Sequence, residues 1–398
     1  MFGLEVILKF RYPEYYDRFA CIADRCEDTC CAGWEIDIDD ASFSYYQSVG
    51  GEFGERLRRQ IREYEQEEED VYEKHGFILK EDKRCPFLDE NNLCVIYREL
   101  GEKALCSVCT DTPRNYLEYG GAREVSLSAS CAEAGRLIYG SREPIAFVER
   151  ELEEELDFEE SEEELALAEA VRWARDQAIR LLQNRTMSVE NRICVFLHFA
   201  KKVQDCLNED DIGAIQRIDI TTEIHDTTTV EKEGCNEQMR LFLSRLRSFS
   251  EMESISEEWE RMLGLMQKRY LNPADGARRY AAERRAYDRS LVEMEREYEK
   301  EHLMVYYSFL CLARCVDDYD FLGKAKLAVT SFLMIRDMDT AWYGEHQGIY
   351  TKEDRVMTAR IYAKEVEHSE VNLSYLADEF LFEEAYTIEN LCASLTSL

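Results

Sequence analysis

The stretch Cys21-Ile-Ala-Asp-Arg-Cys26-Glu-Asp-Thr-Cys30-Cys31 opens a run of closely spaced cysteines in the first third of the chain. Three later groups continue the run: Cys85-Pro-Phe-Leu-x5-Cys94, Cys106-x2-Cys109 and Cys131. Nine of the fifteen cysteines fall in this region. Thiolates are soft ligands for iron–sulfur clusters, zinc or copper(I). Their density here therefore indicates a metal-binding module rather than packing alone.

The start of the sequence, Met1–Phe10, lacks the basic leader, long apolar stretch and small-residue cleavage site of a secretion signal. No run approaches the ~18 apolar residues that are needed to cross a bilayer. We therefore expect a cytoplasmic protein without membrane insertion. Disulfides are uncommon in that compartment, so metal or cluster ligation is favoured over disulfide pairing, with free core thiols as the remaining alternative.

The charge balance is strongly acidic, because 49 Lys and Arg stand against 83 Asp and Glu, and 49 − 83 = −34. Such a chain should repel nucleic acid and anionic membranes, so we expect no nucleic-acid partner. It should attract a lysine-rich protein partner. The plainer alternative is that the charge only keeps the protein soluble.

The periodicity predicts a mainly α fold in two parts. Residues 1–141 are expected to form a small cysteine-rich metal- or cluster-binding module with short strands, and residues 142–398 a larger α-helical body. Alternation of Trp34, Ile36 and Ile38 with acidic residues predicts a short half-buried strand. The charged, proline-free stretch 52–75 predicts a helix.

The second part of the sequence is helical in pattern almost throughout. The acidic run 149–164 is expected to be a solvated helix face or a connector. Ser161-Glu-Glu-Glu resembles a capping box at a helix start, and Ser188 precedes another helix. Residues 210–235 form a polar excursion with little periodicity. Further helical patterns cover residues 275–315, 321–339, 353–367 and 371–382.

The metal type is open from spacing alone. An iron–sulfur cluster needs about four thiolates. Structural zinc needs four ligands from short Cys-x2–4-Cys knuckles or histidines. Adjacent Cys30 and Cys31 fit knuckle geometry poorly, and only His75 lies within the cysteine-rich segment. These features favour a cluster without excluding zinc.

The cysteine stretches, together with one segment in the second half, resemble the flagellin lysine-N-methylase (FliB-type) family. The matching segments are Phe19-Ala-Cys21 to Gly33-Trp34, Cys85-Pro-Phe-Leu to Cys94, Cys109-x3-Pro113-Arg114, Leu127-Ser-Ala-Ser-Cys131-Ala-Glu133 and Glu365-Val-Glu367-His368-Ser369. The resemblance runs from about residue 5 to residue 380, and the cysteine pattern is its specific part. It implies methyl transfer from S-adenosylmethionine to lysine ε-amines of flagellin, and a cysteine-bound [4Fe–4S] cluster.

The resemblance carries the metal-ligand role onto eight cysteines. They are Cys21, Cys26, Cys30, Cys31, Cys85, Cys94, Cys109 and Cys131. Cys106 stands where the pattern has a small non-cysteine residue, so it falls outside this set. Eight thiols exceed the need of one cluster, so either two metal centres exist or several cysteines have other roles.

Lysine methylation needs a neutral amine, although the lysine amine is mostly protonated at neutral pH. The candidate proton acceptors are Glu365, Glu367 and His368. On a helix, Glu365 and His368 would share a face, and the plainer alternative is an ordinary charged triplet. Tyr306 and Tyr307 lie in an apolar stretch and are expected in the core.

The donor site has little support in the sequence. No glycine-rich strand-to-helix turn of the Rossmann type occurs. Cys26-x3-Cys30-Cys31 falls one residue short of the radical S-adenosylmethionine spacing. Arg114 is the candidate for pairing with the donor's carboxylate, with a structural arginine as the alternative. The alternative functions are a non-catalytic iron- or zinc-chelating or redox-sensing protein, and a structural zinc module supporting an interaction scaffold.

Overall fold

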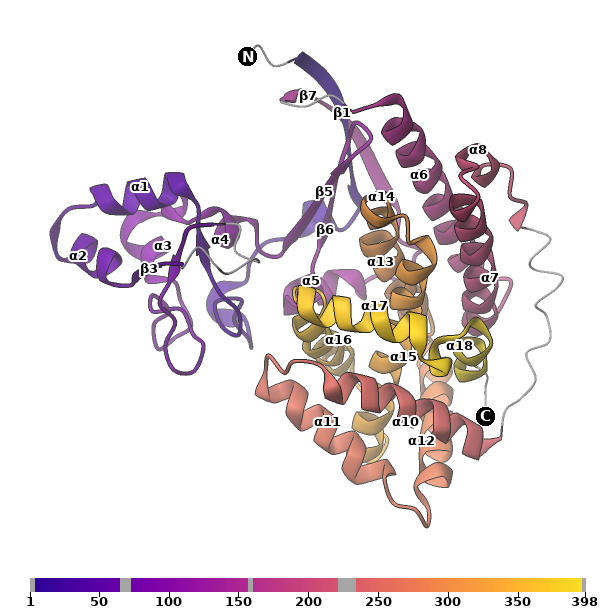
Figure 1. The fold of residues 1–398 in the computed structure, drawn as a ribbon. Helices are drawn as coiled ribbons and strands as arrows, with labels where there is room; N and C mark the ends of the chain where they lie inside the picture. Colours follow the sequence, from indigo (N-terminus) through magenta and orange to yellow (C-terminus); the bar gives the residue numbers. More distant parts are fainter. Residues whose placement is uncertain (1–3, 65–72, 157–159, 221–233, 396–398) are drawn as a thin grey trace. The chain divides into compact units, whose positions relative to one another are not determined.

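The computed structural model describes residues 4–64, 73–156, 160–220 and 234–395 (Figure 1). Its contacts divide the chain into two compact units that alternate along the sequence. The helical unit comprises Met1–Arg18, Tyr116–Ser126 and Gly135–Leu398, and the cysteine unit comprises Phe19–Asn115 and Leu127–Ala134. The division into folding domains at residues 141 and 142 stays a prediction, because compactness does not test independent folding.

The cysteine unit contains a three-stranded antiparallel sheet in the order β2-β4-β3. Its strands are β2 (Asp37–Ile38), β4 (His75–Phe77) and β3 (Ile61–Glu63), and its helices are α1 (Asp40–Ser48), α2 (Gly51–Arg59), α3 (Val95–Leu100) and α4 (Ser107–Asp111). The strand predicted from Trp34 to Ile38 is confirmed in its last two residues. Ile36 and Ile38 are both buried in the core of this unit, as the alternation indicated.

The helix predicted over 52–75 is wrong beyond its first turns. Helix α2 ends at Arg59, and β3 begins at Ile61. His75 starts β4 instead of ending a helix, while residues 65–72 lie outside the described part. Tertiary contacts explain the difference, because β3 pairs with β4 and Ile61 packs against the core of the unit. These contacts outweigh the local helix preference of a charged stretch that has no apolar periodicity.

The helical unit carries most of a four-stranded sheet in the order β5-β6-β1-β7. The strands are β5 (Arg114–Tyr119), β6 (Ala122–Leu127), β1 (Leu4–Pro13) and β7 (Phe147–Leu156). Strand β1 runs parallel to β6 and antiparallel to β7, with Leu4 opposite Leu156. The acidic run 149–164 was expected to be a helix face or a connector, and this prediction is wrong for residues 149–156, which belong to β7. Strand β7 pairs with β1 along its whole length, which satisfies the backbone groups of β7 and holds this segment in a strand.

The predicted helix starts are confirmed in detail. Helix α6 (Glu162–Leu182) begins with a complete capping box, in which Glu164 N donates to Ser161 Oγ at 3.2 Å and Ser161 N donates to Glu164 Oε2 at 2.7 Å. Ser188 caps α7 (Val189–Asn208) in the same manner through its side chain. Both caps satisfy amides that would otherwise lack partners at a helix start.

The remaining helices form the body of the chain. They are α5 (Ala132–Ile138), α8 (Ile212–Ile215), α10 (Cys235–Glu251), α11 (Glu257–Tyr270), α12 (Gly276–Glu293), α13 (Tyr298–Cys311), α14 (Cys315–Asp318), α15 (Phe321–Glu345), α16 (Lys352–Val366), α17 (Glu370–Phe382) and α18 (Ile388–Leu395). The expected helical tracts are confirmed, with 275–315 divided into α12 and α13. Much of the polar excursion, residues 221–233, lies outside the described part.

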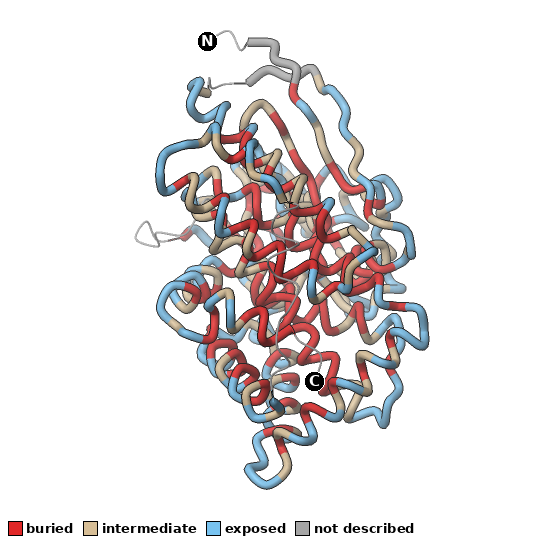
Figure 2. The backbone as a smooth tube through the Cα atoms, turned by 90° about the vertical axis from the view of Figure 1, so that its right-hand side faces the viewer, coloured by how far each residue is buried: buried red, intermediate tan, exposed pale blue. Residues whose placement is uncertain are grey.

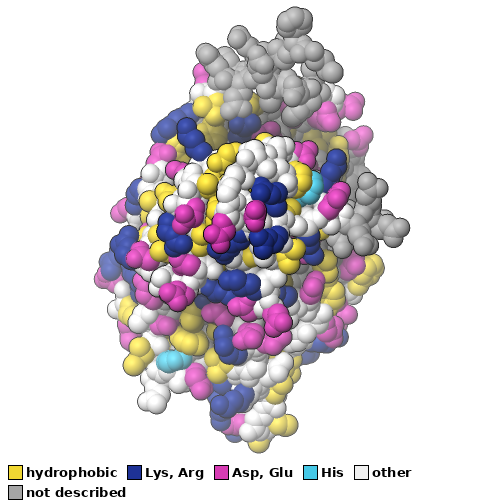
Figure 3. All heavy atoms as spheres, turned by 90° about the vertical axis from the view of Figure 1, so that its left-hand side faces the viewer, with side chains coloured by type: hydrophobic (Ala, Val, Ile, Leu, Met, Phe, Trp, Pro, Cys, Tyr) yellow, Lys and Arg dark blue, Asp and Glu magenta, His cyan; other side chains and the backbone are white. Residues whose placement is uncertain are grey.

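The chain is therefore mainly α-helical, with short strands near its N-terminus. Figure 2 shows buried stretches running through the interior of the helical unit, with exposure concentrated at the turns. Among the described residues, no helix is both long and apolar enough to span a bilayer. On the face seen in Figure 3, basic and acidic side chains are interspersed, so the net negative charge does not form one continuous patch there.

Candidate functional site

The cysteine unit brings its thiols together through paired loops. Cys85 N donates to Cys31 O at 2.8 Å, beside a bridge between Ala32 and Arg84. Cys94 comes after a turn that is closed by a bridge to Leu88. All fifteen cysteines lie in the described part of the chain, and none of them forms a disulfide. Disulfide pairing, the disfavoured alternative, is therefore not what joins these loops.

Several of these thiols accept a hydrogen bond from a backbone amide two or three residues further along. Ala23 N lies 3.5 Å from Cys21 Sγ, and Phe87 N lies 3.5 Å from Cys85 Sγ. The same type of contact reaches Cys26 from Asp28, Cys94 from Ile96 and Tyr97, and Cys131 from Glu133 and Ala134. Amide donors favour the thiolate, which is the form that binds metal.

Burial opposes this preference for the thiolate. It raises the pKa of Cys85 to about 11 against the effect of the Phe87 amide. It also raises the pKa of Cys131 to about 11. Without a metal ion, these thiols are therefore protonated at neutral pH, and binding of a metal would have to displace their protons.

Cys106 and Cys109 form the closest thiol pair in the unit. Cys106 Sγ lies 3.4 Å from Cys109 Sγ, and Cys106 is fully buried. This contact lowers the pKa of Cys106 and raises that of Cys109. The family pattern leaves Cys106 outside the predicted ligand set, although its sulfur contacts that of Cys109, which is inside the set.

The thiols interact electrostatically in two groups that Cys30 connects. Cys31, Cys85, Cys94, Cys106 and Cys109 form the first group, and Cys21, Cys26, Cys30 and Cys131 form the second, while Cys30 also acts on Cys94. Within the described residues, however, no three His, Cys, Asp or Glu side chains are close enough to hold a metal ion as they stand. Thiol chemistry and amide donors fit a thiolate-bound centre, and the individual ligand roles stay predictions.

Asp39 connects the first helix of this unit to the thiol pair. Its Oδ1 accepts from Ser42 N at 2.8 Å and caps α1, while its Oδ2 accepts from Ser107 N at 2.9 Å and Ser107 Oγ at 3.0 Å. Ser107 is the first residue of α4, directly after Cys106. One carboxylate thus fixes both helix starts.

Replacing Asp39 by alanine should lower the stability of the cysteine unit by about 1–2 kcal/mol, because two sets of amides lose their acceptor. Burial works to raise the pKa of Asp39, but hydrogen bonds from Ser107 and Ser42 lower it to about 2. The stabilisation is therefore present above the ordinary pKa and is lost as the pH falls towards 2. Urea denaturation of the variant measures the loss. Asp40→Ala, at the exposed next position, is the control and should change stability less.

Arg114 already has partners within the cysteine unit. Its Nη1 donates to Thr110 O at 3.3 Å, and its guanidinium lies 5.5 Å from the centre of the Phe19 ring. Thr110 belongs to α4, so Arg114 lies beside the helix that carries Cys109. Its predicted pairing with the carboxylate of a methyl donor stays a prediction.

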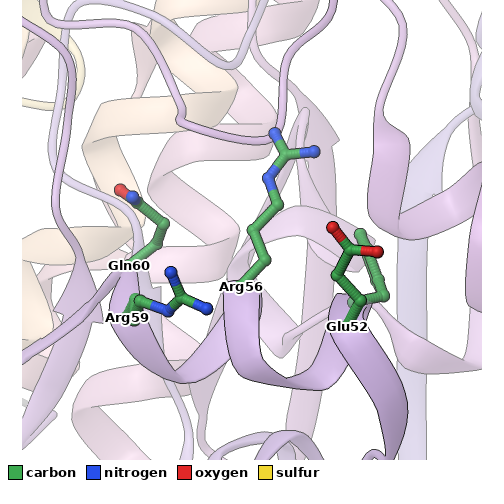
Figure 4. Close-up of a pocket in the computed structure, with 5 residues that line it drawn as sticks. Glu52, Arg56, Arg59 and Gln60 are labelled. Atoms are coloured by element: carbon green, nitrogen blue, oxygen red, sulfur yellow. The ribbon is translucent and has the colours of Figure 1, made fainter.

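The cysteine unit also has a surface pocket of about 520 Å³. Figure 4 shows Glu52, Arg56 and Arg59 on α2 and Gln60 directly after it, and Phe53 completes the lining. Arg56 is held in place by Pro86 O at 3.0 Å. None of the predicted catalytic or metal-binding residues lines this pocket, so it does not coincide with the site predicted from the sequence.

The predicted catalytic triplet at the end of α16 divides into three different environments. Glu365 is fully buried, and its carboxylate accepts from Ile255 N and Ser256 N, both at 2.8 Å, and from Ser256 Oγ. It therefore holds the loop that leads into α11. Because α16 ends at Val366, Glu365 and His368 do not share a helix face, and that expectation is wrong.

Glu367 is partly exposed and caps the end of α16. Its Oε2 accepts a hydrogen bond from Tyr306 Oη at 2.9 Å. Burial is the main cause that raises the pKa of Tyr15, Tyr139 and Tyr307, and the negative charge of Glu367 adds to it in each case. These effects place all four phenols around one carboxylate. We call Tyr15, Tyr139, Tyr306 and Tyr307 the tyrosine cluster.

The tyrosine cluster is buried, with every member at most 3% exposed. The expectation that Tyr306 and Tyr307 are core residues is confirmed. The rings of Tyr306 and Tyr307 lie 5.0 Å apart, edge to face. In the described part of the chain, the buried hydroxyls of Tyr139 and Tyr307 have no hydrogen-bond partner. Buried polar atoms without partners are uncommon in folded proteins and call for an explanation.

His368 is exposed on the turn after α16. The protein around the ring disfavours its charged form, and the positive charge of Arg314 adds to this, so the pKa of His368 is lowered to about 4. The imidazole is therefore neutral at neutral pH. Unlike the Glu367 carboxylate, it provides no negative charge for an approaching ammonium group.

The second half of the chain is similar to a known protein family. The model of the FliB lysine N-methylase C-terminal domain matches residues 175–394, which is more than half of the chain. The chain therefore belongs to the FliB lysine N-methylase family. The matched range contains Glu365, Glu367, His368, Tyr306 and Tyr307, whereas the nine clustered cysteines lie before it.

Curated relatives in this family are similar over about a third of the chain. A lysine-N-methylase of Salmonella typhimurium is 30% identical over 144 residues, covering 35% of this chain and 34% of the relative. The flagellar biosynthetic protein FliU of Salmonella muenchen is 29% identical over 144 residues, covering 35% of this chain and 81% of that protein. The matched part thus spans about a third of the Salmonella typhimurium methylase. No solved structure is significantly similar to the chain.

Sequence reasoning identified Glu367 but missed Tyr15 and Tyr139 as its neighbours. Tyr15 follows β1 and Tyr139 follows α5, so neither belongs to the periodic stretch that holds Tyr306 and Tyr307. No spacing rule links these positions to Glu367. Only the fold of the helical unit brings them together.

Proposed function

We propose that this chain is a protein-lysine N-methyltransferase that moves methyl groups from S-adenosylmethionine to surface lysines of flagellin in the cytoplasm. The observation that carries the proposal is the environment of Glu367, a carboxylate in the family-matched range. It lies beside the buried phenols of Tyr306 and Tyr307 from the same range and of Tyr15 and Tyr139 from outside it. Membership of the FliB lysine N-methylase family supports the reaction class. The similarity to the flagellar biosynthetic protein FliU supports a flagellar protein as substrate.

The chemistry of the site suits an amine nucleophile. A lysine ammonium must lose a proton before its nitrogen can attack a methyl group. Glu367 offers a carboxylate that attracts the ammonium and accepts a proton from it directly or through water. The raised pKa values of Tyr139 and Tyr307 keep these phenols protonated, so they serve as hydrogen-bonding groups and not as bases.

An iron–sulfur cluster is the cofactor that we propose for the cysteine unit. The residues that would hold it are drawn from Cys31, Cys85, Cys94, Cys106 and Cys109, or from Cys21, Cys26, Cys30 and Cys131. When bound, it would supply iron and charge with which to hold the methyl donor. We propose that Arg114 assists by pairing with the carboxylate of the donor.

The decisive experiment incubates the anaerobically purified protein with S-adenosylmethionine and flagellin from the same organism. Mass spectrometry of flagellin peptides should show added methyl groups on lysines. Methyl transfer that disappears when either S-adenosylmethionine or the enzyme is left out confirms the proposal. An intact metal centre without any methyl transfer would favour the alternative, a non-catalytic iron- or zinc-chelating or redox-sensing protein.

Cys106→Ser tests whether Cys106 takes part in metal binding. We expect the variant to retain at most about half of the wild-type iron, because loss of one thiolate weakens a site that needs about four. Iron and acid-labile sulfide, measured per folded chain, give the result. Cys206→Ser is the control, since Cys206 lies on α7 in the helical unit. Wild-type iron content in Cys106→Ser would remove Cys106 from the ligand set.

A further inference from the structure

The tyrosine cluster and Glu367 together have the composition of a cation-binding site. We propose that they bind the side-chain ammonium of the substrate lysine, and that the hydroxyls of Tyr139 and Tyr307 limit how many methyl groups the amine receives. This inference rests on the proposed methyltransferase function and adds to it a binding site and a control over the product.

The tyrosine cluster and Glu367 offer the acceptors and the negative charge that a lysine ammonium needs. A lysine ammonium has three N–H donors and no acceptor, and aromatic rings with a carboxylate attract its charge. Glu367 supplies a carboxylate next to Tyr306, and its negative charge reaches the phenols of Tyr15, Tyr139 and Tyr307. A primary or methylated ammonium is the ligand class that satisfies both the charge and the rings.

Two hydroxyls of the tyrosine cluster lack a hydrogen-bond partner among the described residues. A buried hydroxyl without a hydrogen bond costs stability relative to one that is paired. Tyr139 and Tyr307 each have such a hydroxyl among the described residues, although both rings are almost fully buried. A phenylalanine at either position would avoid the cost, so the retained oxygens are explained if they accept N–H bonds from a bound amine.

Contacts within the protein hold the rings of Tyr139 and Tyr307 in place before any ligand binds. The guanidinium of Arg355 lies 5.8 Å from the centre of the Tyr139 ring, and Tyr139 O accepts from Tyr298 Oη at 3.2 Å. Tyr307 packs at 5.9 Å against Tyr362. Groups that are held in place lose little conformational freedom on binding, which favours a selective site.

The site lies close to the surface of the helical unit. Glu367 is partly exposed as a residue although its Oε1 is buried, and its neighbour His368 is exposed on the turn after α16. A lysine side chain has a long apolar stem with its charge at the tip, and such a stem can lie along apolar and aromatic surface. We infer that the stem enters at this turn and that its nitrogen meets Glu367 first.

The limit on the number of methyl groups follows from the bonds that each methyl transfer forms and breaks. The nitrogen lone pair forms a bond to the methyl carbon, the methyl–sulfur bond breaks, and its electron pair stays on the donor's sulfur. The nitrogen then carries one proton too many, and Glu367 or water accepts it. Each transfer replaces an N–H by a methyl group. A hydroxyl that accepts a hydrogen bond from this N–H disfavours the next methylation, because the methyl group would break the hydrogen bond and would need the space that the hydroxyl occupies.

Tyr139→Phe and Tyr307→Phe test the role of the two hydroxyls. Either variant should raise the ratio of higher to lower methylation states on flagellin lysines by about tenfold, because one small group that contacts a substrate changes selectivity by roughly this amount. The melting temperature should stay the same or rise, since no hydrogen bond within the protein is lost. Mass spectrometry and thermal denaturation give the two readouts.

Tyr362→Phe is the matched control. Its ring packs on Tyr307 and it also feels the charge of Glu367, but its hydroxyl already pairs with Ser331 Oγ at 2.8 Å. This variant should lose stability and keep the wild-type distribution of methylation states. The proposed control over methyl number is wrong if the Tyr139 and Tyr307 variants keep the wild-type distribution while the wild-type protein transfers methyl groups.

A binding measurement separates this inference from the proposed function. The intact protein is titrated with n-butylammonium, and binding is followed by calorimetry or by NMR of the ligand. Glu367→Gln should weaken binding at least about tenfold, because the charged partner is removed. Equal binding by wild type and variant, or no binding to wild type, overturns the site. Binding that depends on Glu367 in a protein unable to methylate flagellin supports the site and rejects the methyltransferase.

Discussion

Replacing Glu367 by glutamine should slow methyl transfer to flagellin lysines by about 10²–10⁴-fold, the range typical for loss of a positioned acid or base. The substitution keeps the shape of the side chain and an oxygen that can accept from Tyr306 Oη. It removes the negative charge that attracts the ammonium and receives its proton. Initial rates with radiolabelled S-adenosylmethionine, taken across lysine substrate concentrations, measure both kcat and kcat/KM.

The neighbouring carboxylate provides the matched comparison. Glu365→Gln should lower the stability by about 1–3 kcal/mol, because one of the acceptors for Ile255 N and Ser256 N is replaced by an amide donor. Its activity per folded molecule should stay close to that of wild type. If Glu365→Gln loses activity while Glu367→Gln keeps it, the roles assigned to the two residues are reversed.

The other candidates near Glu367 lack its negative charge. The pKa of His368 is lowered to about 4, so its imidazole is neutral at neutral pH and carries no charge to attract an ammonium. Burial raises the pKa of Tyr139 and Tyr307, so neither phenol ionises in the neutral range. Glu367 is left as the group that combines negative charge with partial exposure.

Local sequence rules predicted the parts of the fold that depend on neighbours in the chain. Ser161 with Glu164 marked the start of α6, and Ser188 marked α7, because capping depends on residues three apart. The stretch before residue 157 was misread, since its strand β7 is specified by pairing with β1 at the other end of the N-terminal region. Charge composition gave no sign of that partner.

Local sequence rules also predicted only part of the candidate site. Glu367 was identified from a short motif, and Glu365 in the same motif has a structural role that only its contacts with Ile255 and Ser256 show. Tyr15 and Tyr139 come from two other segments, so no spacing connects them with Glu367. Cys106-x2-Cys109 was recognised as a cysteine group, but Cys106 was left out of the predicted ligands because the family pattern has no cysteine at that position.

Replacing Glu124 by alanine should destabilise the helical unit by about 3–5 kcal/mol, because it leaves the buried charge of Arg175 without a partner. Glu124 lies on β6 and Arg175 on α6, with side chains 3% and 0% exposed. Arg175 Nη2 donates to Glu124 Oε1 at 2.6 Å, and Nη1 donates to Oε2. Tyr119 Oη donates to Oε1 at 3.0 Å, so the carboxylate also orders β5.

The direction of the pH dependence follows from the same contacts. Burial alone would raise the pKa of Glu124, but the charge of Arg175 lowers it below the ordinary value. A carboxylate with a lowered pKa stabilises the fold above its unfolded pKa, and the contribution is lost as the pH falls through the folded value. The difference in stability between wild type and Glu124→Ala should therefore shrink as the solution is acidified.

Urea denaturation followed by circular dichroism measures the loss, with Glu118→Ala as the control. Glu118 pairs with Arg123 at the surface, where side chains are 41% and 25% exposed, so its loss should cost less than about 1 kcal/mol. The double change Glu124→Leu with Arg175→Met should recover most of the stability, because it removes both buried charges. Equal losses for Glu124→Ala and Glu118→Ala would mean that water reaches Arg175 and replaces its partner, and the pair would then contribute little to joining β6 and α6.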